Sequence, residues 1–241
     1  MAKVKAFLKF NNEQNQSDFS HTKCLLSISI GQQSHEGEMF ESTIELVNQN
    51  FGSCAISLYD SLQRYTMALQ SSKSPEFFHA VATKEGDLWI KRNKKYLDQL
   101  NKLEVICRWD MWLQHPTFTR YRKELKDLIN TDDEYKAVFD QTVEKYLDKY
   151  CSQLMKTPAF DKTRVKNLCL EYVVEECAVL RLWPELQCQY EAYPGIHNAA
   201  MEETRRRFVT IEHFDLLQPL TIKFRNAPQL RPQRFELFEA V

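Results

Sequence analysis

Two serine hydroxyls in one short apolar run are the groups of this sequence best placed to act as nucleophiles. Ser27 and Ser29 lie within residues 23–32, a run with β-branched side chains that ends near Gly31 and precedes a helical pattern. This pattern predicts a buried strand, and residues two apart share one of its faces. Open α/β sheets bind ligands beyond the carboxyl ends of their strands, so Ser29 would face such a crevice. Two small polar fillers at a strand end would give the same pattern.

A tyrosine and a glutamate on one predicted helix could hold a cation or exchange a proton. Apolar residues recur at helical spacing over residues 165–182. Tyr172 and Glu176 are four residues apart and share a face that is otherwise apolar, whereas Glu175 points elsewhere. A carboxyl group on a buried face needs a partner or a role. Two interpretations stay open: a Tyr–Glu hydrogen bond that locks the helix, or a carboxylate that awaits a substrate cation or proton.

Basic side chains gather on a long helix predicted over residues 77–100, with an interruption expected at Gly86. On a helix, three of them form one stripe and an arginine lies beside it. A surface of this kind could contact nucleic-acid phosphates. A solvated helix face has the same pattern, and the pattern alone favours that interpretation. The basic residues are Lys84, Lys91 and Lys95 in the stripe, Arg92 beside it, and Lys94.

The composition restricts the classes of protein to consider. With 241 residues we expect a single domain over 1–241, and a net charge of −1 confines any nucleic-acid footprint to a local patch. The seven cysteines form no Cys-x-x-Cys pair, so we expect reduced core thiols. A phosphate-binding loop and a dinucleotide fingerprint are both missing, so we expect no cofactor, and the lack of a Cys-x-x-Cys pair predicts no metal site. The sequence has no apolar run long enough for a membrane span and no signal-peptide pattern. Reduced cysteines favour the cytoplasm.

Strand and helix patterns alternate along the chain, which predicts an α/β fold with a mainly parallel sheet flanked by helices. Asp60 follows the strand predicted over residues 53–59, where it could contact a ligand or cap the next helix. The other strands are expected over residues 4–9, 25–30 and 102–109 and within residues 210–224. The helices are expected over residues 38–48, 77–100, 165–182 and 198–208 and within 111–150, with a break at 130–133, and a loop is expected over 190–197.

The residues around Ser29 resemble a motif of the cyclodipeptide synthase family. In that family, a strand similar to Leu25-Leu26-Ser27-Ile28-Ser29 ends in the nucleophilic serine. This chain has Ser27 where the family usually has glycine, and Lys23 where many members have histidine.

Three further stretches resemble motifs of the same family and follow in the family's order. Tyr172-Val173-Val174-Glu175-Glu176 is similar to the second signature, although Ala178 stands where proline is common. Tyr193-Pro194 matches the Tyr-Pro pair of one of the two subfamilies, and Gln32, in place of asparagine three residues after the nucleophile, also suggests that subfamily. Residues 86–93 are similar to the basic helix with which the family holds transfer RNA.

The resemblance implies a Rossmann-like fold similar to class I aminoacyl-tRNA synthetase catalytic domains. It also implies an aminoacyltransferase that makes a cyclic dipeptide from two aminoacyl-tRNAs, and an ester that is already activated needs neither ATP nor a metal. Ser29 would carry an aminoacyl and then a dipeptidyl group. Glu176 and the Tyr172 hydroxyl would hold the substrate ammonium, and Glu176 or Tyr193 would relay its proton.

The resemblance places the substrates as well. Gln32 would contact the second aminoacyl group or the reacting carbonyl, and the basic helix would contact acceptor-stem phosphates. His35 is the nearest histidine but is expected in a loop, and the terminal hydroxyl of the tRNA can take the Ser29 proton instead. No membrane and no obligate protein partner is implied, and a monomer is expected. The expected substrate-binding residues are Leu25 and Ser27 near the first aminoacyl pocket, with Glu191 facing the same pocket, together with Gln32, Asp60 and Pro194.

Rival functions predict other sequence features. A non-catalytic tRNA-binding protein of the same fold would not need Ser29, Tyr172 and Glu176 together. A serine hydrolase would carry Gly-x-Ser-x-Gly at its nucleophile, and here Ser27 replaces the first glycine. A true synthetase would carry ATP-binding signatures, and neither a His-x-Gly-His run nor a Lys-Met-Ser-Lys-Ser run is present.

Overall fold

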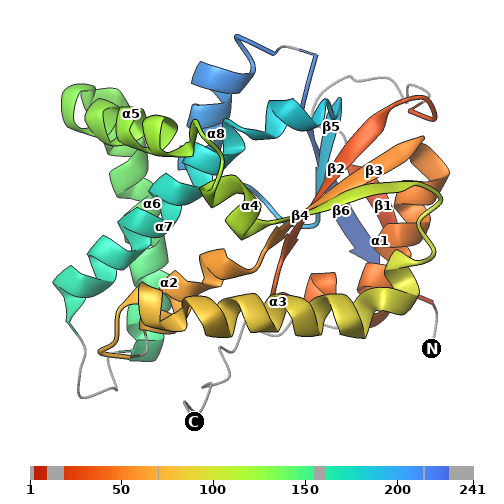
Figure 1. The fold of residues 1–241 in the computed structure, drawn as a ribbon, viewed down its shortest axis with the longest axis horizontal. Helices are drawn as coiled ribbons and strands as arrows, with labels where there is room; N and C mark the ends of the chain where they lie inside the picture. The colour runs from red at the N-terminus through yellow and green to blue at the C-terminus, as the bar shows by residue number, and fades with distance from the viewer. Residues whose placement is uncertain (1–2, 10–18, 70, 155–160, 214, 228–241) are drawn as a thin grey trace.

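Within the described residues, six strands form one sheet that carries Ser29 near its centre. The structure is a computed structural model and describes residues 3–9, 19–69, 71–154, 161–213 and 215–227. The strands are β1 (Lys5–Lys9), β2 (Lys23–Ser29), β3 (Ser53–Tyr59), β4 (Leu103–Arg108), β5 (Tyr190–Tyr193) and β6 (Gln218–Arg225). Their order is β1-β6-β5-β2-β3-β4, and every neighbouring pair is parallel except β1 with β6. The predicted α/β class with a mainly parallel sheet is confirmed (Figure 1).

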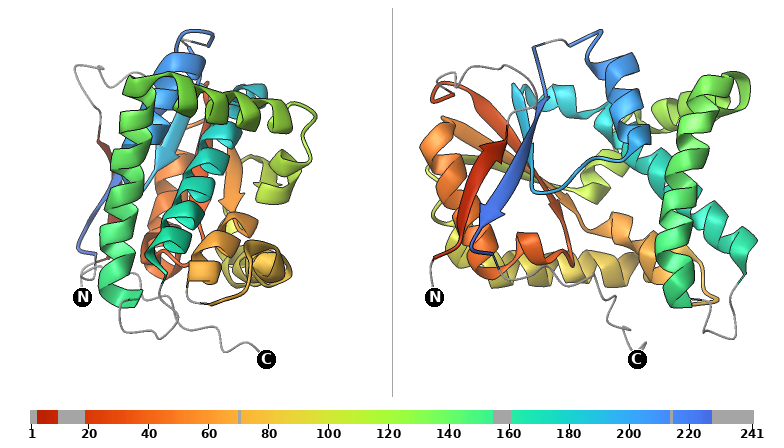
Figure 2. Two further views of the ribbon diagram at one scale, coloured as in Figure 1. Left: turned by 90° about the vertical axis from the view of Figure 1, so that its left-hand side faces the viewer. Right: turned by 180° about the vertical axis from the view of Figure 1, so that it is seen from behind.

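Helices cover both faces of this sheet. Figures 1 and 2 show α5 to α8 gathered on one side of the molecule, with α3 running along another edge. The α-helices are α1 (Gly37–Asn50), α2 (Arg64–Leu69), α3 (Pro75–Leu97), α4 (Trp109–Leu113), α5 (Phe118–Thr131), α6 (Asp133–Leu154), α7 (Lys162–Leu180) and α8 (Ala199–Thr204). Short 3₁₀ turns are η1 (Gln33–His35), η2 (Ser61–Gln63) and η3 (Trp183–Leu186), and η4 (Arg205–Val209) is a π-helical turn.

Strand β2 sends alternate side chains to two separate cores. Leu26 and Ile28 belong to the core shared with α1 and α3, which contains the buried Trp89. Leu25 belongs to the other core, where Val173 of α7 packs. Because side chains alternate along a strand, Ser29 shares the face of Leu25 and points toward α7.

Two expectations about secondary structure are wrong, and long-range contacts explain both. Residues 190–193 form β5 between β2 and β6, where a loop was expected. The charged residue Glu191 interrupts the apolar pattern that would have indicated a strand. It can be buried in β5 because its carboxylate pairs with Arg205. Helix α3 is continuous through Gly86. A Cβ at Gly86 would lie 2.6 Å from Asp60 Oδ2, so the glycine permits close packing and does not break the helix.

The other predicted elements are present. The strands over residues 53–59 and 102–109 correspond to β3 and β4, and the helix-rich region divides at Asp132 into α5 and α6. The short helix α2 was not predicted. The six cysteines whose side chains are described are free and buried, and Cys151 lies outside that set. No described helix combines the length and the apolar character that a membrane crossing requires.

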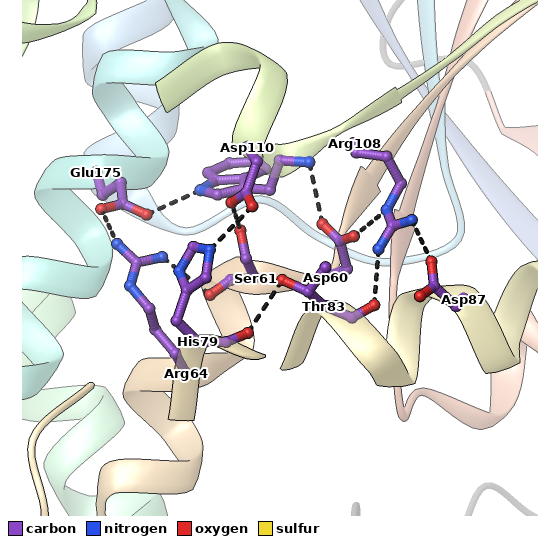
Figure 3. Close-up of polar contacts among 10 residues, drawn as sticks. Asp60, Ser61, Arg64, His79, Thr83, Asp87, Arg108, Asp110 and Glu175 are labelled. Carbon is purple, nitrogen blue, oxygen red and sulfur yellow. Dashed lines mark hydrogen bonds and ion pairs between the residues drawn. The ribbon is translucent and has the colours of Figure 1, made fainter. Parts of the chain in front are cut away.

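A buried ion pair connects three helices beside the sheet (Figure 3). Arg64 of α2 donates to Glu175 of α7 at 2.5 Å. Tyr65 also donates to this carboxylate at 3.0 Å, and the indole N–H of Trp109 on α4 donates to its other oxygen at 2.8 Å. Glu175 is only 2% exposed. The network therefore fixes α7 against α2 and α4.

We predict that Glu175→Ala lowers the free energy of unfolding in urea by about 3–5 kcal/mol, because it leaves the Arg64 charge buried without its partner. Glu144→Ala is the control, since Glu144 pairs with Lys166 on the exposed surface at 3.0 Å and should cost less than about 1 kcal/mol. Equal losses in the two variants would contradict a structural role for this ion pair.

Candidate functional site

A cavity of about 230 Å³ lies at the carboxyl end of β2. It is lined by side chains from β2, β3, β5, α6, α7 and the loop that leads into α8. Five residues singled out from the sequence meet there although they span more than half of the chain. They are Ser29, Gln32, Tyr172, Glu176 and Tyr193.

Ser29 is held through its backbone. It is the last residue of β2 and is 5% exposed, and Gly31, at a φ of +83°, turns the chain directly after it. Nδ1 of His35 lies 2.9 Å from the Ser29 amide nitrogen and 2.8 Å from its carbonyl oxygen. Burial lowers the pKa of His35 to about 4, so the ring is neutral near pH 7. His35 therefore contacts the Ser29 main chain.

Glu176 projects into the cavity from α7. Its carboxylate accepts a hydrogen bond of 2.8 Å from the side-chain amide of Asn198 and is 5% exposed. Burial raises the pKa of Glu176 to about 7, while the charge of His197 and the Asn198 hydrogen bond act in the opposite direction. Near neutral pH this carboxyl can therefore either hold a cation or exchange a proton.

Tyr172 lies one helical turn before Glu176 and lines the same cavity. Its ring contacts two other tyrosines, with centroids 5.8 Å from Tyr146 and 6.4 Å from Tyr65. The helix therefore presents a hydroxyl and a carboxyl on one face, as their spacing of four residues predicts. Glu175 is directed into the ion-pair network with Arg64.

Tyr193 ends β5 beside Ser29. Its hydroxyl accepts a hydrogen bond of 3.1 Å from the Gln32 amide. Burial raises the pKa of Tyr193, and hydrogen bonds from the Ser29 and Gln32 side chains act in the opposite direction. The ring stacks on His197 with centroids 5.1 Å apart and an angle of 20°. Ser29, Gln32 and Tyr193 thus form one polar group at the carboxyl end of β2.

A second carboxylate lies close to the cavity. Glu191 is fully buried; it accepts from Ser27 Oγ at 2.9 Å, contacts His197 Nε2 at 3.1 Å and forms an ion pair with Arg205. Although burial alone would raise the pKa of Glu191, the charges of His197 and Arg205 and the hydrogen bonds from His197 and Ser27 lower it to about 2. Glu191 therefore stays ionised next to the partly protonated Glu176.

Five expected substrate-binding residues do not line the cavity, and one of them is Glu191, described above. Leu25 is buried in the core, Ser27 is bonded to Glu191, and Pro194 lies directly after Tyr193. Asp60 forms an ion pair with Arg108 and accepts from the backbone N–H of Trp109 at 3.0 Å (Figure 3). Asp60 does follow the carboxyl end of β3, as predicted. Its carboxylate, however, is paired with Arg108 from the adjacent strand β4.

Several residues of the cavity were not singled out from the sequence. Asn198 combines two tasks: its side-chain oxygen caps α8 by accepting from the Met201 N–H at 2.9 Å, while its amide nitrogen donates to Glu176. A cap could have been inferred from an asparagine before a helix, but its contact across the fold could not. The others are Tyr59, Gln63, Thr66, Tyr146, Ile196, His197 and Met201.

The five basic residues predicted on α3 are all exposed. Arg92 pairs with Glu36 at 3.0 Å, and Lys94 pairs with Asp98 at 2.7 Å. Among the described residues, no acidic group forms an ion pair with Lys84, Lys91 or Lys95. These three lysines remain available to an external anion. Across all residues that the structure describes, no cluster of three or more His, Cys, Asp or Glu side chains is arranged to hold a metal ion.

Solved structures resemble this fold over nearly its full length. A cyclodipeptide synthase (CDPS) from Fluoribacter dumoffii is 33% identical to this chain. Its TM-score is 0.86 over 93% of this chain and 100% of that one. A cyclodipeptide synthase from Candidatus Glomeribacter gigasporarum, bound to Phe-tRNAPhe, is 16% identical with a TM-score of 0.74 over 87% and 90% of the two chains.

A Mycobacterium tuberculosis protein, whose structure relates cyclodipeptide synthetases to type I tRNA synthetases, is 12% identical with a TM-score of 0.59 over 92% and 93% of the two chains. No protein-family model and no curated protein matches the sequence.

The raised pKa of Glu176 predicts a measurable pH dependence of stability. The folded protein retains this proton up to about pH 7, whereas an ordinary glutamate releases it near pH 4.5. Between these values the folded state binds more protons than the unfolded state, so this group makes stability fall as the pH rises and then level off. We expect the loss in wild type between pH 5 and pH 8 to exceed that of Glu176→Gln by roughly 2–3 kcal/mol in urea unfolding. Parallel pH profiles for the two proteins would contradict the assignment.

Proposed function

The chain belongs to the cyclodipeptide synthase family, and on this premise we propose that it joins the aminoacyl groups of two aminoacyl-tRNAs into a cyclic dipeptide. The observation that carries this proposal is the cavity in which Ser29, Tyr172, Glu176 and Tyr193 meet. Because aminoacyl-tRNAs are cytoplasmic, we place the reaction there. The Tyr193-Pro194 pair, with Gln32 bonded to Tyr193, favours the subfamily that carries a Tyr-Pro pair.

In the first step, Ser29 Oγ attacks the carbonyl carbon of the first aminoacyl ester. The Oγ–carbon bond forms, the bond to the terminal ribose oxygen of the tRNA breaks, and that oxygen takes the serine proton. This assignment fits a site in which His35 contacts the Ser29 backbone. Gln32, which donates one amide hydrogen to Tyr193, would use the other to stabilise the developing oxyanion.

Glu176 and Tyr172 hold the ammonium group of the serine-bound residue. A charge-assisted hydrogen bond from the ammonium to the Glu176 carboxylate is the main anchor, and Asn198 fixes the orientation of that carboxylate. Holding the amine in place makes the later bond formation effectively intramolecular.

The amine must lose a proton before it reacts. We assign this proton to Glu176, whose pKa of about 7 suits a group that both accepts and releases protons near neutral pH. The amine then attacks the ester of the second aminoacyl-tRNA, which forms the first peptide bond and releases the second tRNA. The free amine of the resulting dipeptidyl group attacks the Ser29 ester, which closes the ring and regenerates the serine, with Tyr193 positioned to relay the proton.

The exposed lysines of α3 would bind the tRNA backbone. Lys84, Lys91 and Lys95 have positions along one side of the helix and no ion pair among the described residues. The paired Arg92 and Lys94 would contribute less, because their charges are already partly neutralised. This surface supplies binding energy but reads no sequence.

We predict that bacteria that express the chain release cyclic dipeptides that are absent for Ser29→Ala. Mass spectrometry of the medium identifies them, and Ser72→Ala, on an exposed loop, is the matched control that retains production. Product from a folded Ser29→Ala variant would exclude Ser29 as the nucleophile. The lack of any product from folded wild type, together with retained tRNA binding, would favour a non-catalytic tRNA-binding protein.

We also predict that the triple variant Lys84→Ala, Lys91→Ala, Lys95→Ala weakens the salt dependence of tRNA binding. The slope of log affinity against log salt should become shallower by about 2–3, because each phosphate contact contributes roughly 0.7–0.9. The control replaces Lys123, Lys136 and Lys166 by Ala, which gives the same net charge but removes lysines that are already paired with acidic residues. An equal change of slope in both triple variants would contradict the proposal that the lysines of α3 contact the tRNA phosphates.

A further inference from the structure

Tyr59 places a buried hydroxyl beside Ser29. It is the last residue of β3 and lies opposite Ser29 in the parallel register. The side chain lines the cavity and is 2% exposed, and its hydroxyl makes no hydrogen bond to any residue that the structure describes. Ser27 Oγ is close enough to influence the Tyr59 hydroxyl, but its hydrogen is donated to Glu191, so the Tyr59 oxygen stays open to a hydrogen-bond donor of a ligand. A buried hydroxyl without a partner costs about 1–3 kcal/mol, so a ligand that supplies a hydrogen bond here gains affinity.

Ser57 adds a second hydroxyl of the same kind one step deeper along β3. It lies opposite Ser27, is fully buried, and its Oγ has no hydrogen-bond partner within the described part of the chain. Ser57 and Tyr59 share one face of the strand, while the intervening Leu58 packs in the other core. Of these two hydroxyl-bearing residues only Tyr59 lines the cavity, so Ser57 can influence a ligand only indirectly, from behind the cavity wall.

The rest of the cavity wall is also polar. An apolar aminoacyl side chain would remove water from these groups without replacing its hydrogen bonds, which is unfavourable. The wall beyond the catalytic residues carries the side chains of Gln63, Thr66, Tyr146, His197 and Asn198, and its apolar members are Ile196 and Met201.

The charges near the cavity restrict the substrate further. Both oxygens of Glu191 are occupied, by Ser27 and His197 on one side and by Arg205 on the other, so this carboxylate is not free to bind a cationic side chain. An anionic side chain would face Glu191 and the carboxylate form of Glu176, and like charges in a partly buried site repel.

On the basis of the function proposed above, we propose that the aminoacyl group bound to Ser29 carries a neutral hydrogen-bonding side chain, a hydroxyl or a carboxamide, which is recognised by the Tyr59 hydroxyl with support from Ser57. Tyr59 is thus a specificity-determining residue of the first aminoacyl site. A site built to hydrogen-bond a substrate hydroxyl can reject the analogue that lacks it by on the order of 10⁴-fold.

The test charges one tRNA species with different amino acids in turn, so that only the side chain differs. The rate at which labelled amino acid becomes attached to Ser29 is measured with the purified full chain. Threonine is compared with its isostere valine, and asparagine with leucine, while glutamate and lysine test the two charged classes. We expect threonine, asparagine or both to exceed the apolar partner by on the order of 10²-fold or more.

Tyr59→Phe should reduce this preference to less than about 10-fold by slowing the polar substrate and sparing the apolar one. Tyr190→Phe, on the opposite face of the sheet, is the matched control and should keep the preference. Ser57→Ala provides a second, smaller change and should reduce the preference in part. A variant that folds poorly would lose both rates together.

The outcomes separate this inference from the proposed function. Equal wild-type rates for each polar and apolar pair, a faster charged substrate, or a preference that survives both Tyr59→Phe and Ser57→Ala would overturn the inference and leave the function intact. If no aminoacyl group of any kind becomes attached to Ser29 in folded wild type, the proposed function itself fails.

Discussion

The buried ion pair between Arg64 and Glu175 is the constraint on which the site depends. It fixes α7 against α2 and α4 next to the carboxyl end of β2, and the Trp109 indole completes the hydrogen bonds of the carboxylate. Once the rotation of α7 is set in this way, the next residue, Glu176, faces the cavity. Two consecutive glutamates therefore have different tasks because a helix turns by about 100° per residue.

Burial alone does not decide how the carboxyls of the site ionise. Glu176 and Glu191 are both buried, yet their pKa values are raised to about 7 and lowered to about 2. Glu191 has Arg205 and His197 to compensate for its lost hydration, whereas Glu176 has only a neutral amide and the more distant His197 charge. The protein thus keeps one carboxylate as a permanent part of its structure and leaves the other able to exchange a proton. The same distinction between paired and unpaired polar groups is the basis on which we propose a ligand contact at Tyr59.

Local patterns in the sequence predicted most of the sheet and the position of Ser29 at the end of its strand, because alternation and helical spacing report directly on buried faces. They also brought Tyr172 and Glu176 to one face. They failed where a partner distant in the sequence determines the environment and the contacts of a residue. Glu191 lies in a strand because Arg205 neutralises it, and Asp60 is occupied by Arg108. The Tyr59 hydroxyl and the Asn198 amide are ordinary in the sequence, and only the fold gives them a role.

In the reaction that we propose, the pKa of Glu176 would also allow one group both to hold and to deprotonate an amine. An ammonium beside the carboxyl favours its ionised form, so substrate binding would lower this pKa below its value of about 7 in the free protein. Loss of the ammonium charge removes that effect and raises the pKa again. Proton transfer from the amine to Glu176 then leaves two neutral groups in a cavity that stabilises charge poorly, which lowers the cost of forming the nucleophilic amine. A histidine base is not required for this step, and His35 is free to fix the Ser29 backbone.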